Sequence, residues 1–293
     1  MSQELEVPGS PATVRRVPTR RIEFPFETAE MPRHFMGGDL VRSHVVAVLS
    51  CMFPEGEDFF VRSVRNYRDR IVDPELKAQV AGFIGQESIH GREHRAFNDR
   101  LGELGYPTRF LDRRVKAGLW LLGRIQPTAQ QLAVTAALEH YTATLAETLL
   151  TSEAARAYTD VAEVRELFMW HALEESEHKA VAFDVFQAVS GNESIRIGIM
   201  RATTVVFLIA VISGTAVSLA LDPASRDLRR LWRSLRNLRH SPFFSRDVRT
   251  MLASYNQRGF HPDDRDTSAL LERWRTEMFG PDGTMNGRLK VAV

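Results

Sequence analysis

Two copies of a Glu-x-x-His step limit what this chain can fold into more than any other feature of its sequence. One step runs from Glu87 to His90, and the other runs from Glu175 to His178. On an α-helix, side chains three positions apart lie on one face about one turn apart, so each step directs a carboxylate and an imidazole to the same side. Two such helices facing each other predict a shared metal site inside a helical bundle.

The spacing of apolar residues predicts an all-α fold. Signals for β-strands, such as alternating runs bounded by tight turns, are almost absent. A first helix is expected from about 37 to 53, where Pro54 should end it, and a second from about 55 to 73. Further helices are expected over about 74–104, 109–124, 127–150 and 152–189, with two or three shorter ones towards the end of the chain.

We expect three regions along the chain. Residues 1–20 are polar and contain three prolines, which predicts a flexible tail. Residues 21–192 should form the main bundle, and the aromatics of Phe24-Pro25-Phe26 should contact it. Residues 193–293 should add a hydrophobic helix and short helices that pack on the bundle or extend from it.

The hydrophobic helix is expected at 202–221, where 20 consecutive residues carry no charge. That length matches the hydrocarbon thickness of a bilayer at about 1.5 Å per residue. Three placements fit this run: buried in a large bundle, lying at a membrane interface, or spanning a membrane. Arginines on both sides give no inside–outside bias, while those between Arg226 and Arg239 suit an anionic membrane surface or a solvated helix face.

Charge and cysteine content bear on partners and compartment. The formal net charge of +1 gives no indication of nucleic-acid binding. Cys51 is the single cysteine, so no intrachain disulfide can form, which favours a reducing compartment. The first residues lack the apolar core of a secretory signal. We therefore expect a cytoplasmic protein, with membrane association through 202–221 as one alternative, and the sequence is also compatible with a homodimer.

Ionisable side chains interrupt the apolar face of three predicted helices near its midpoint. An isolated buried carboxylate costs several kcal/mol unless it is paired or bound to metal. Three helices with the same interruption are better explained by a shared partner, and a pair of divalent cations is the simplest one. A fourth predicted helix offers Glu57, although the neighbouring Glu55 and Asp58 suggest that Glu57 is alternatively a favourable charge at a helix start. The candidate ligands are Glu57, Glu87, His90, His94, Glu139, His171, Glu175 and His178.

The order of these residues resembles the ferritin-like dimetal-carboxylate superfamily. That superfamily takes one Glu from each of two helices and a Glu-x-x-His from each of two others. The resemblance implies a ferritin-like bundle, here with extra C-terminal helices, in which Glu87 and Glu175 bridge two ions. It further implies that one ion binds Glu57 and His90 and that the other binds Glu139 and His178.

Two finer resemblances follow from neighbouring residues. His171 lies one turn before Glu175, and the resulting His-x-x-x-Glu-x-x-His step is similar to the arylamine N-oxygenase branch, in which a third histidine joins the site. His94 supplies a further imidazole on the partner helix. The Phe-Pro-Phe segment and the motifs at 86–94 and 170–178 resemble a bacterial family labelled predicted metal-dependent hydrolases.

The resemblance implies a di-iron centre that reacts with O₂. Hard oxygen ligands with a few imidazoles suit iron, manganese or a mixed pair. We therefore expect an O₂-dependent oxidoreductase that acts on a small, fairly apolar or lipid-like molecule, with Glu87 and Glu175 at the reacting centre. The sequence identifies neither the substrate nor the electron donor.

Two other function classes stay open. A metal-dependent hydrolase could use the same residues as a dinuclear centre, or a single zinc held by His90 and His94 with Glu93 as general base, as in the His-x-x-Glu-His motif. The single-zinc arrangement leaves Glu87, Glu139 and Glu175 without a role. The third class is a non-catalytic metal-binding helical protein.

Overall fold

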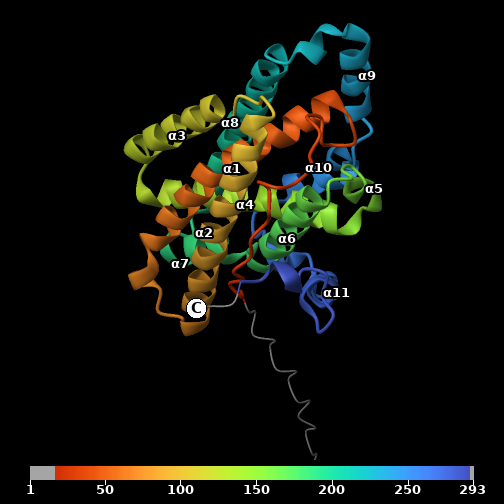
Figure 1. Ribbon diagram of the computed structural model, residues 1–293. Helices are drawn as coiled ribbons and strands as arrows, with labels where there is room; N and C mark the ends of the chain where they lie inside the picture. Colours follow the sequence, from red (N-terminus) through yellow and green to blue (C-terminus); the bar gives the residue numbers. More distant parts are fainter. Residues whose placement is uncertain (1–16, 291–293) are drawn as a thin grey trace, which may run out of the picture.

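The computed structural model describes residues 17–290, and it confirms the predicted all-α class (Figure 1). Two pairs of long helices form the centre of the molecule. The first pair is α1 (Leu40–Arg65) with α2 (Pro74–Glu103), and the second is α4 (Thr128–Thr151) with α6 (Ala162–His178). The pairs contact each other through α1 with α4 and α2 with α6. The remaining α-helices are α3 (Thr108–Ile125), α5 (Glu153–Arg156), α7 (Val181–Val189), α8 (Glu193–Ala220), α9 (Leu228–Leu238), α10 (Arg246–Ser254) and α11 (Ser268–Phe279).

Helix α1 corrects the prediction that Pro54 separates two helices, because Pro54 lies inside it. A proline has no amide hydrogen, so the carbonyl four residues earlier loses its helical partner. That carbonyl belongs to Ser50, and the Asn98 side chain of α2 donates a hydrogen bond to it at 3.0 Å. A partner 48 residues away in the chain thus lets the helix continue, and local spacing cannot reveal such a partner.

The segment expected as one helix over 152–189 is three helices. Ser152 caps α5 by accepting a hydrogen bond from the amide of Ala155. The chain then leaves the helical path before α6, where the Thr159 hydroxyl donates to the carbonyl of Phe35 and accepts from the amide of Val161. Hydroxyl side chains compete with helical hydrogen bonds in this way. A two-residue turn after His178 separates α6 from α7.

The N-terminal segment follows the prediction only in part. Residues 1–16 of the expected tail lie outside the described residues, whereas Val17 packs on α2 so closely that a Cβ on Gly82 would collide with its backbone. Phe24 and Phe26 are buried, as expected for a segment that contacts the bundle. Ile22 also pairs with Leu289 in an isolated antiparallel bridge, so residues near both ends of the chain meet.

Helix α8 contains residues 202–220 of the predicted apolar run and packs on α1 and α4. It is long and apolar enough to cross a membrane, but its most apolar 18-residue window is only 22% buried. Of the three placements left open for this run, burial inside the bundle does not agree with this exposure, and the other two stay open. The proposed boundary at 192/193 falls between α7 and α8 and stays a prediction.

Candidate metal centre

The structure brings together all eight predicted ligands in the middle of the bundle. All eight residues are buried, and none of them is more than 4% exposed. Helix α1 supplies one of them, α2 three, α4 one and α6 three, so the four central helices converge on one cluster. From α1 to α6 these residues are Glu57; Glu87, His90 and His94; Glu139; and His171, Glu175 and His178.

Glu175 lies between two groups of imidazoles. Its Oε1 is 2.8 Å from Nε2 of His171 and 3.7 Å from Nδ1 of His90. Its Oε2 faces the other way and is 3.6 Å from Nε2 of His178. The two oxygens of one carboxylate are thus directed to two sides of the cluster, which is what a bridge between two ions requires.

Glu87 occupies the matching position on α2. Its Oε1 is 3.6 Å from Nδ1 of His90 and 3.1 Å from Nε2 of His178. Glu139 lies beside His178, with 3.2 Å between Oε2 and Nε2, and Glu57 lies beside His171, with 3.8 Å between Oε1 and Nε2. The two outer glutamates therefore lie near different histidines, while Glu87 contacts both sides.

The buried polar atoms of the cluster that lack hydrogen bonds indicate whether metal ions would fit the site. Nine fully buried side-chain atoms of the cluster make no well-oriented hydrogen bond, although several of them lie within ion-pair distance of one another. They are both oxygens of Glu57, Glu87 and Glu139, Oε2 of Glu175, Nδ1 of His90 and Nε2 of His178. Buried polar groups normally find partners, and each one without a partner costs roughly 1–3 kcal/mol. Ligand atoms of Glu57, Glu87 and His90 lie within 4.8 Å of one another, as do those of Glu87, Glu175 and His178. Two adjacent cations would satisfy these atoms, so the residues fit a dinuclear centre.

The charges of the cluster are strongly coupled. Burial and the neighbouring Glu87 carboxylate raise the pKa of Glu57 well above its ordinary value. Burial and Glu175 likewise raise the pKa of Glu139 to about 8. Burial opposes the charged form of His90, but Glu174 and Glu87 outweigh it and raise the pKa of His90 to about 10. Without cations the cluster therefore holds extra protons, which metal ions would displace.

His90 and His178 each leave one ring nitrogen without a hydrogen bond, whereas His94, like His171, has partners at both of its ring nitrogens. Nδ1 is 2.9 Å from the hydroxyl of Ser50, and Nε2 is 2.7 Å from Nδ1 of His171. Burial and the neighbouring His171 ring lower its pKa well below the ordinary value. This geometry favours a residue that orients His171 over one that binds an ion itself.

A ring of polar side chains surrounds the cluster and holds its histidines. Gln86 Oε1 is 2.8 Å from Nδ1 of His178, and Glu174 Oε2 is 3.0 Å from Nε2 of His90. Such partners fix the tautomer and orientation of metal-binding histidines. Gln86 in turn donates to Glu177, which is fully buried.

Two arginines complete this ring, and sequence reasoning missed both. Arg20 contacts Glu174 at 2.9 Å and Glu177 at 2.8 Å, although it was expected to lie in a flexible tail. Arg275 of α11 contacts Glu177 at 2.7 Å. Neither arginine lies in a motif, and the signal that could have found them was the pair of surplus carboxylates on α6, which needed cationic partners once buried.

The geometry does not support a single zinc site with Glu93 as the base. Glu93 accepts a hydrogen bond from the amide of Phe24 at 2.9 Å and pairs with Arg92 at 2.7 Å, so its carboxylate is occupied outside the cluster.

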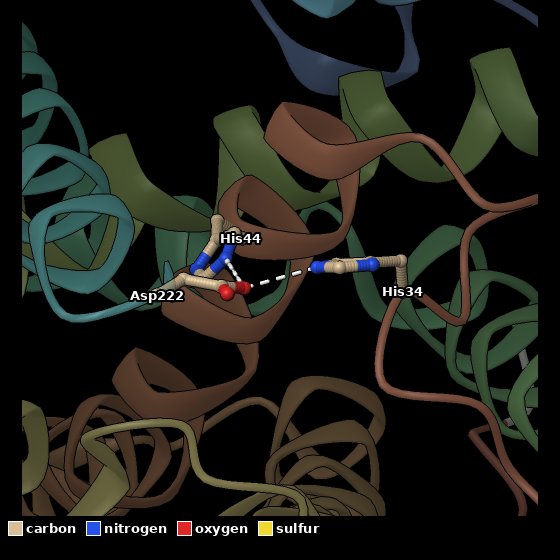
Figure 2. Close-up of side chains that lie close together, drawn as sticks. All are labelled: His34, His44 and Asp222. Carbon is tan, nitrogen blue, oxygen red and sulfur yellow. Dashed lines mark hydrogen bonds and ion pairs between the residues drawn. The ribbon is translucent and has the colours of Figure 1, made fainter. Parts of the chain in front are cut away.

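A second cluster of His34, His44 and Asp222 lies apart from the first, where the loop before α1, α1 itself and the end of α8 meet. Figure 2 shows both histidines directed at one oxygen of Asp222, at 2.9 Å and 3.0 Å from their Nε2 atoms. These three residues could hold a metal by distance alone. Their other contacts oppose it, because Arg33 donates to the same oxygen at 3.2 Å and Arg230 donates to Nδ1 of His34 at 2.8 Å.

The second cluster is therefore satisfied by hydrogen bonds. Nδ1 of His44 is 2.7 Å from the Ser218 hydroxyl, and the second oxygen of Asp222 accepts from the amide of Ala224 at 2.9 Å. Despite its burial, the donors around it keep the pKa of Asp222 well below its ordinary value. We call these residues the His34–His44–Asp222 latch, because they fasten the end of α8 to α1.

Comparison with known proteins agrees with a metal-binding role. The model of a family described as predicted metal-dependent hydrolase matches residues 18–266, which include every residue of the central cluster. No match was found among curated proteins or among solved structures. The match covers most of the sequence and confirms the resemblance to that family, so the chain belongs to the predicted metal-dependent hydrolase family.

Proposed function

We propose that this protein is a dinuclear metal enzyme that oxidises a small, fairly apolar molecule with O₂ at a pair of iron ions. One observation carries the proposal, namely the nine unsatisfied atoms arranged around Glu87 and Glu175. A carboxylate-rich set with a few imidazoles suits iron or manganese better than zinc, which prefers nitrogen and sulfur ligands. The proposal keeps the dependence on metal that the family's description names, but it departs from that description on the reaction, which is given there as hydrolysis.

The roles of the ligands follow from their positions. Glu87 and Glu175 would bridge the ions, since each contacts histidines on both sides. One ion would take Glu57 and His90, and His171 lies close enough to join it. The other ion would take Glu139 and His178. When bound, the iron pair would supply the binding and reduction of O₂.

The protein surrounds these ligands with aromatic rings. Phe53 lies 4.8 Å from the His171 ring, Phe83 5.0 Å from His178 and Trp170 4.8 Å from His90, measured between ring centroids. These walls exclude water and strengthen electrostatic interactions within the cluster. They also suit an apolar substrate, which is the class that we propose.

Metal analysis combined with oxygen exposure tests the proposal. The full chain is purified without oxygen in the presence of Fe²⁺, its metals are counted, and O₂ is then admitted while the near-ultraviolet and visible spectrum is followed. We expect about two irons per chain, as in the dinuclear carboxylate proteins, and a spectral change that depends on O₂. One metal ion per chain, or two irons with no response to O₂, would contradict it.

Hydrolysis is the second candidate because the family's description names it. A dinuclear centre can activate water for attack on an ester or a phosphoester. Protein loaded with redox-inert zinc and assayed under nitrogen distinguishes the two reactions. Turnover of a panel of esters and phosphoesters there would favour the hydrolase, whereas activity that needs both iron and O₂ would favour the oxidase.

A further inference from the structure

Helix α8 has its apolar side on the outside. Its buried positions include Thr203, Gly214, Thr215 and Ser218, which are small or carry a hydroxyl group. Its exposed positions include five large aliphatic residues that are 47–67% exposed, namely Val205, Val206, Leu208, Ile209 and Ile212. A surface helix of a protein surrounded by water shows the opposite arrangement. Small residues on the packed side and large apolar ones on the outer side are typical of helices that contact lipid.

The surroundings of Gly214 show that the inner side of α8 packs closely against its neighbours. A Cβ added there would lie 3.0 Å from Val48 of α1 and 3.3 Å from Leu111 of α3. The helix could not rotate to bury its aliphatic side without separating α8 from both neighbours. The exposed side is thus a fixed feature of the fold.

Helix α9 repeats this arrangement with added charge. Leu228, Trp232 and Leu235 follow a spacing of four and three residues, which places them on one face, and they are 74%, 68% and 44% exposed. Arg229, Arg233 and Arg236 follow the same spacing on the adjacent face and are all exposed. Within residues 17–290, none of these three arginines forms an ion pair. An exposed apolar face beside an arginine face is typical of helices that lie in a membrane interface.

Helix α3 also exposes large apolar residues. Its C-terminal half exposes Trp120, Leu121 and Ile125 by 57%, 51% and 69%. Helices α3, α8 and α9 all pack on α1 and lie in the upper part of Figure 1, away from α7 and α11. Of the 16 large apolar residues exposed in the described part of the chain, twelve lie on these three helices, and the others are Val72, Leu221, Phe244 and Leu289. We call the exposed apolar residues of the three helices the α3–α8–α9 surface.

We propose that the α3–α8–α9 surface docks on an anionic lipid membrane, with α8 lying in the interface and not spanning it. The arginines of α9 are the reason for proposing a lipid partner instead of a second copy of the chain. In a twofold dimer the same patch occurs on both subunits, so a contact through α9 would bring unpaired arginines close to arginines. An anionic bilayer instead supplies phosphate groups at the level of the arginines and acyl chains at the level of Trp232.

Both ends of α8 are tied to the body of the protein, which favours the interfacial orientation. Near its N-terminus, the fully buried Arg196 donates to the carbonyls of Tyr255 and Gln257 and pairs with Glu193. At its C-terminus, the His34–His44–Asp222 latch joins Asp222 to α1. A spanning helix would have to release one of these ends to reach the far side of the bilayer.

Vesicle flotation with the full chain tests the proposal. The protein is mixed with vesicles of phosphatidylcholine alone or containing about one third phosphatidylglycerol. We expect flotation with the anionic vesicles, weaker flotation with the neutral ones, and a decrease as salt is raised. Trp232→Glu should reduce binding at least about tenfold, because it places a carboxylate at the apolar face. Phe244→Glu is the matched control, since Phe244 is 56% exposed but lies off the surface, and it should bind like the unaltered protein.

Three results would overturn the proposal. The first is an absence of binding to anionic vesicles by a protein that is folded by circular dichroism. The second is a dimer in light scattering that Trp232→Glu dissociates while the vesicles stay unbound, which would assign the surface to a second copy of the chain. The third is bound protein that resists extraction by alkaline carbonate, which would indicate a spanning helix. None of these readouts depends on the metal or the reaction of the central cluster.

Discussion

The central cluster and the His34–His44–Asp222 latch both combine histidines with carboxylates, but they differ in how many of the polar atoms have hydrogen-bond partners. In the central cluster nine buried atoms lack hydrogen bonds. In the latch both nitrogens of each histidine have partners, and two arginines supply positive charge. Distance alone marks both as groups that could hold a metal. The difference shows that unmet lone pairs, more than residue identity or spacing, distinguish a candidate metal site from a structural network.

Removing a bridging carboxylate should have the largest effect. Glu175→Ala deletes the side chain whose oxygens face both halves of the cluster. We expect loss of essentially all bound metal, exceeding the roughly 10- to 100-fold weakening typical of changes around a metal site. Elemental analysis after purification measures it. Glu166→Ala is the control, because Glu166 lies on the same helix in a partly exposed pair with Arg288. Equal metal content in the two variants would refute the assignment.

Removing the metal should cause the next largest effect, which is a loss of stability. The loss should come from the central cluster and not from the latch. Ions that bind the folded state stabilise it by about 4 kcal/mol when present at about a thousand times their Kd. We expect chelation to lower the urea midpoint accordingly and added Fe²⁺ or Mn²⁺ to restore it. Unfolding curves that are identical with and without chelator would show that the cluster is a polar network without metal.

Breaking the latch should destabilise the protein without changing its metal content. Asp222→Ala leaves the buried His44, the partly buried His34 and Arg33 without their acceptor, which should cost about 3 kcal/mol. Chemical unfolding of the chelated protein measures this cost, and elemental analysis checks the metal. If the variant lost metal in a folded state, the latch would not be independent of the central cluster.

A change in the ring around the central cluster should weaken metal binding without abolishing it. Gln86→Leu removes the partner of Nδ1 of His178 but none of the unsatisfied atoms. We expect metal affinity to fall by about 10- to 100-fold while the stoichiometry at saturation is kept. Titration with Mn²⁺ measures both. Loss of stoichiometry would place Gln86 among the residues that bind the ions directly.

The smallest effect concerns a third histidine–carboxylate contact, which is partly exposed. His261 lies 2.7 Å from Asp184, and that carboxylate raises the pKa of His261. A raised folded-state pKa stabilises the protein fully below the unfolded value of about 6.5, and the effect is lost as the pH rises through the folded value. Asp184→Asn should therefore cost less than about 1 kcal/mol at a pH of about 5.5 and still less at about 9. A cost independent of pH, from urea midpoints, would contradict this explanation.

Much of the fold and of the candidate site followed from the sequence. Helical spacing placed Glu87 with His90, and Glu175 with His178, on the inner faces of their helices, and the structure brings these pairs together. Local patterns suffice for this, because each helix carries its own periodicity. The assignments to the ferritin-like superfamily and to its N-oxygenase branch stay predictions, as do the roles of the eight residues as metal ligands.

What the sequence could not reveal depends on partners far apart in the chain. Asn98 lets α1 continue past Pro54, and Arg20 and Arg275 neutralise carboxylates on α6. The exposure of α8 also depends on distant parts of the chain, because an apolar run of that length has the same sequence pattern whether protein or lipid covers it. Hydrophobicity identifies such a helix, but only its neighbours show which side is covered.

The pairing of Glu177 with Arg20 and Arg275 has a consequence for how the protein is made. Because a ribosome releases the chain from its N-terminus, Glu177 and most of the cluster emerge while Arg275 is still unsynthesised. The contacts of Arg21 and Glu23 with Lys290 and Arg288 close the chain later still. A nascent or prematurely terminated chain would therefore hold the residues for binding metal without the full frame that positions them. The frame around the centre thus depends on residues that follow the cluster by about one hundred positions in the chain.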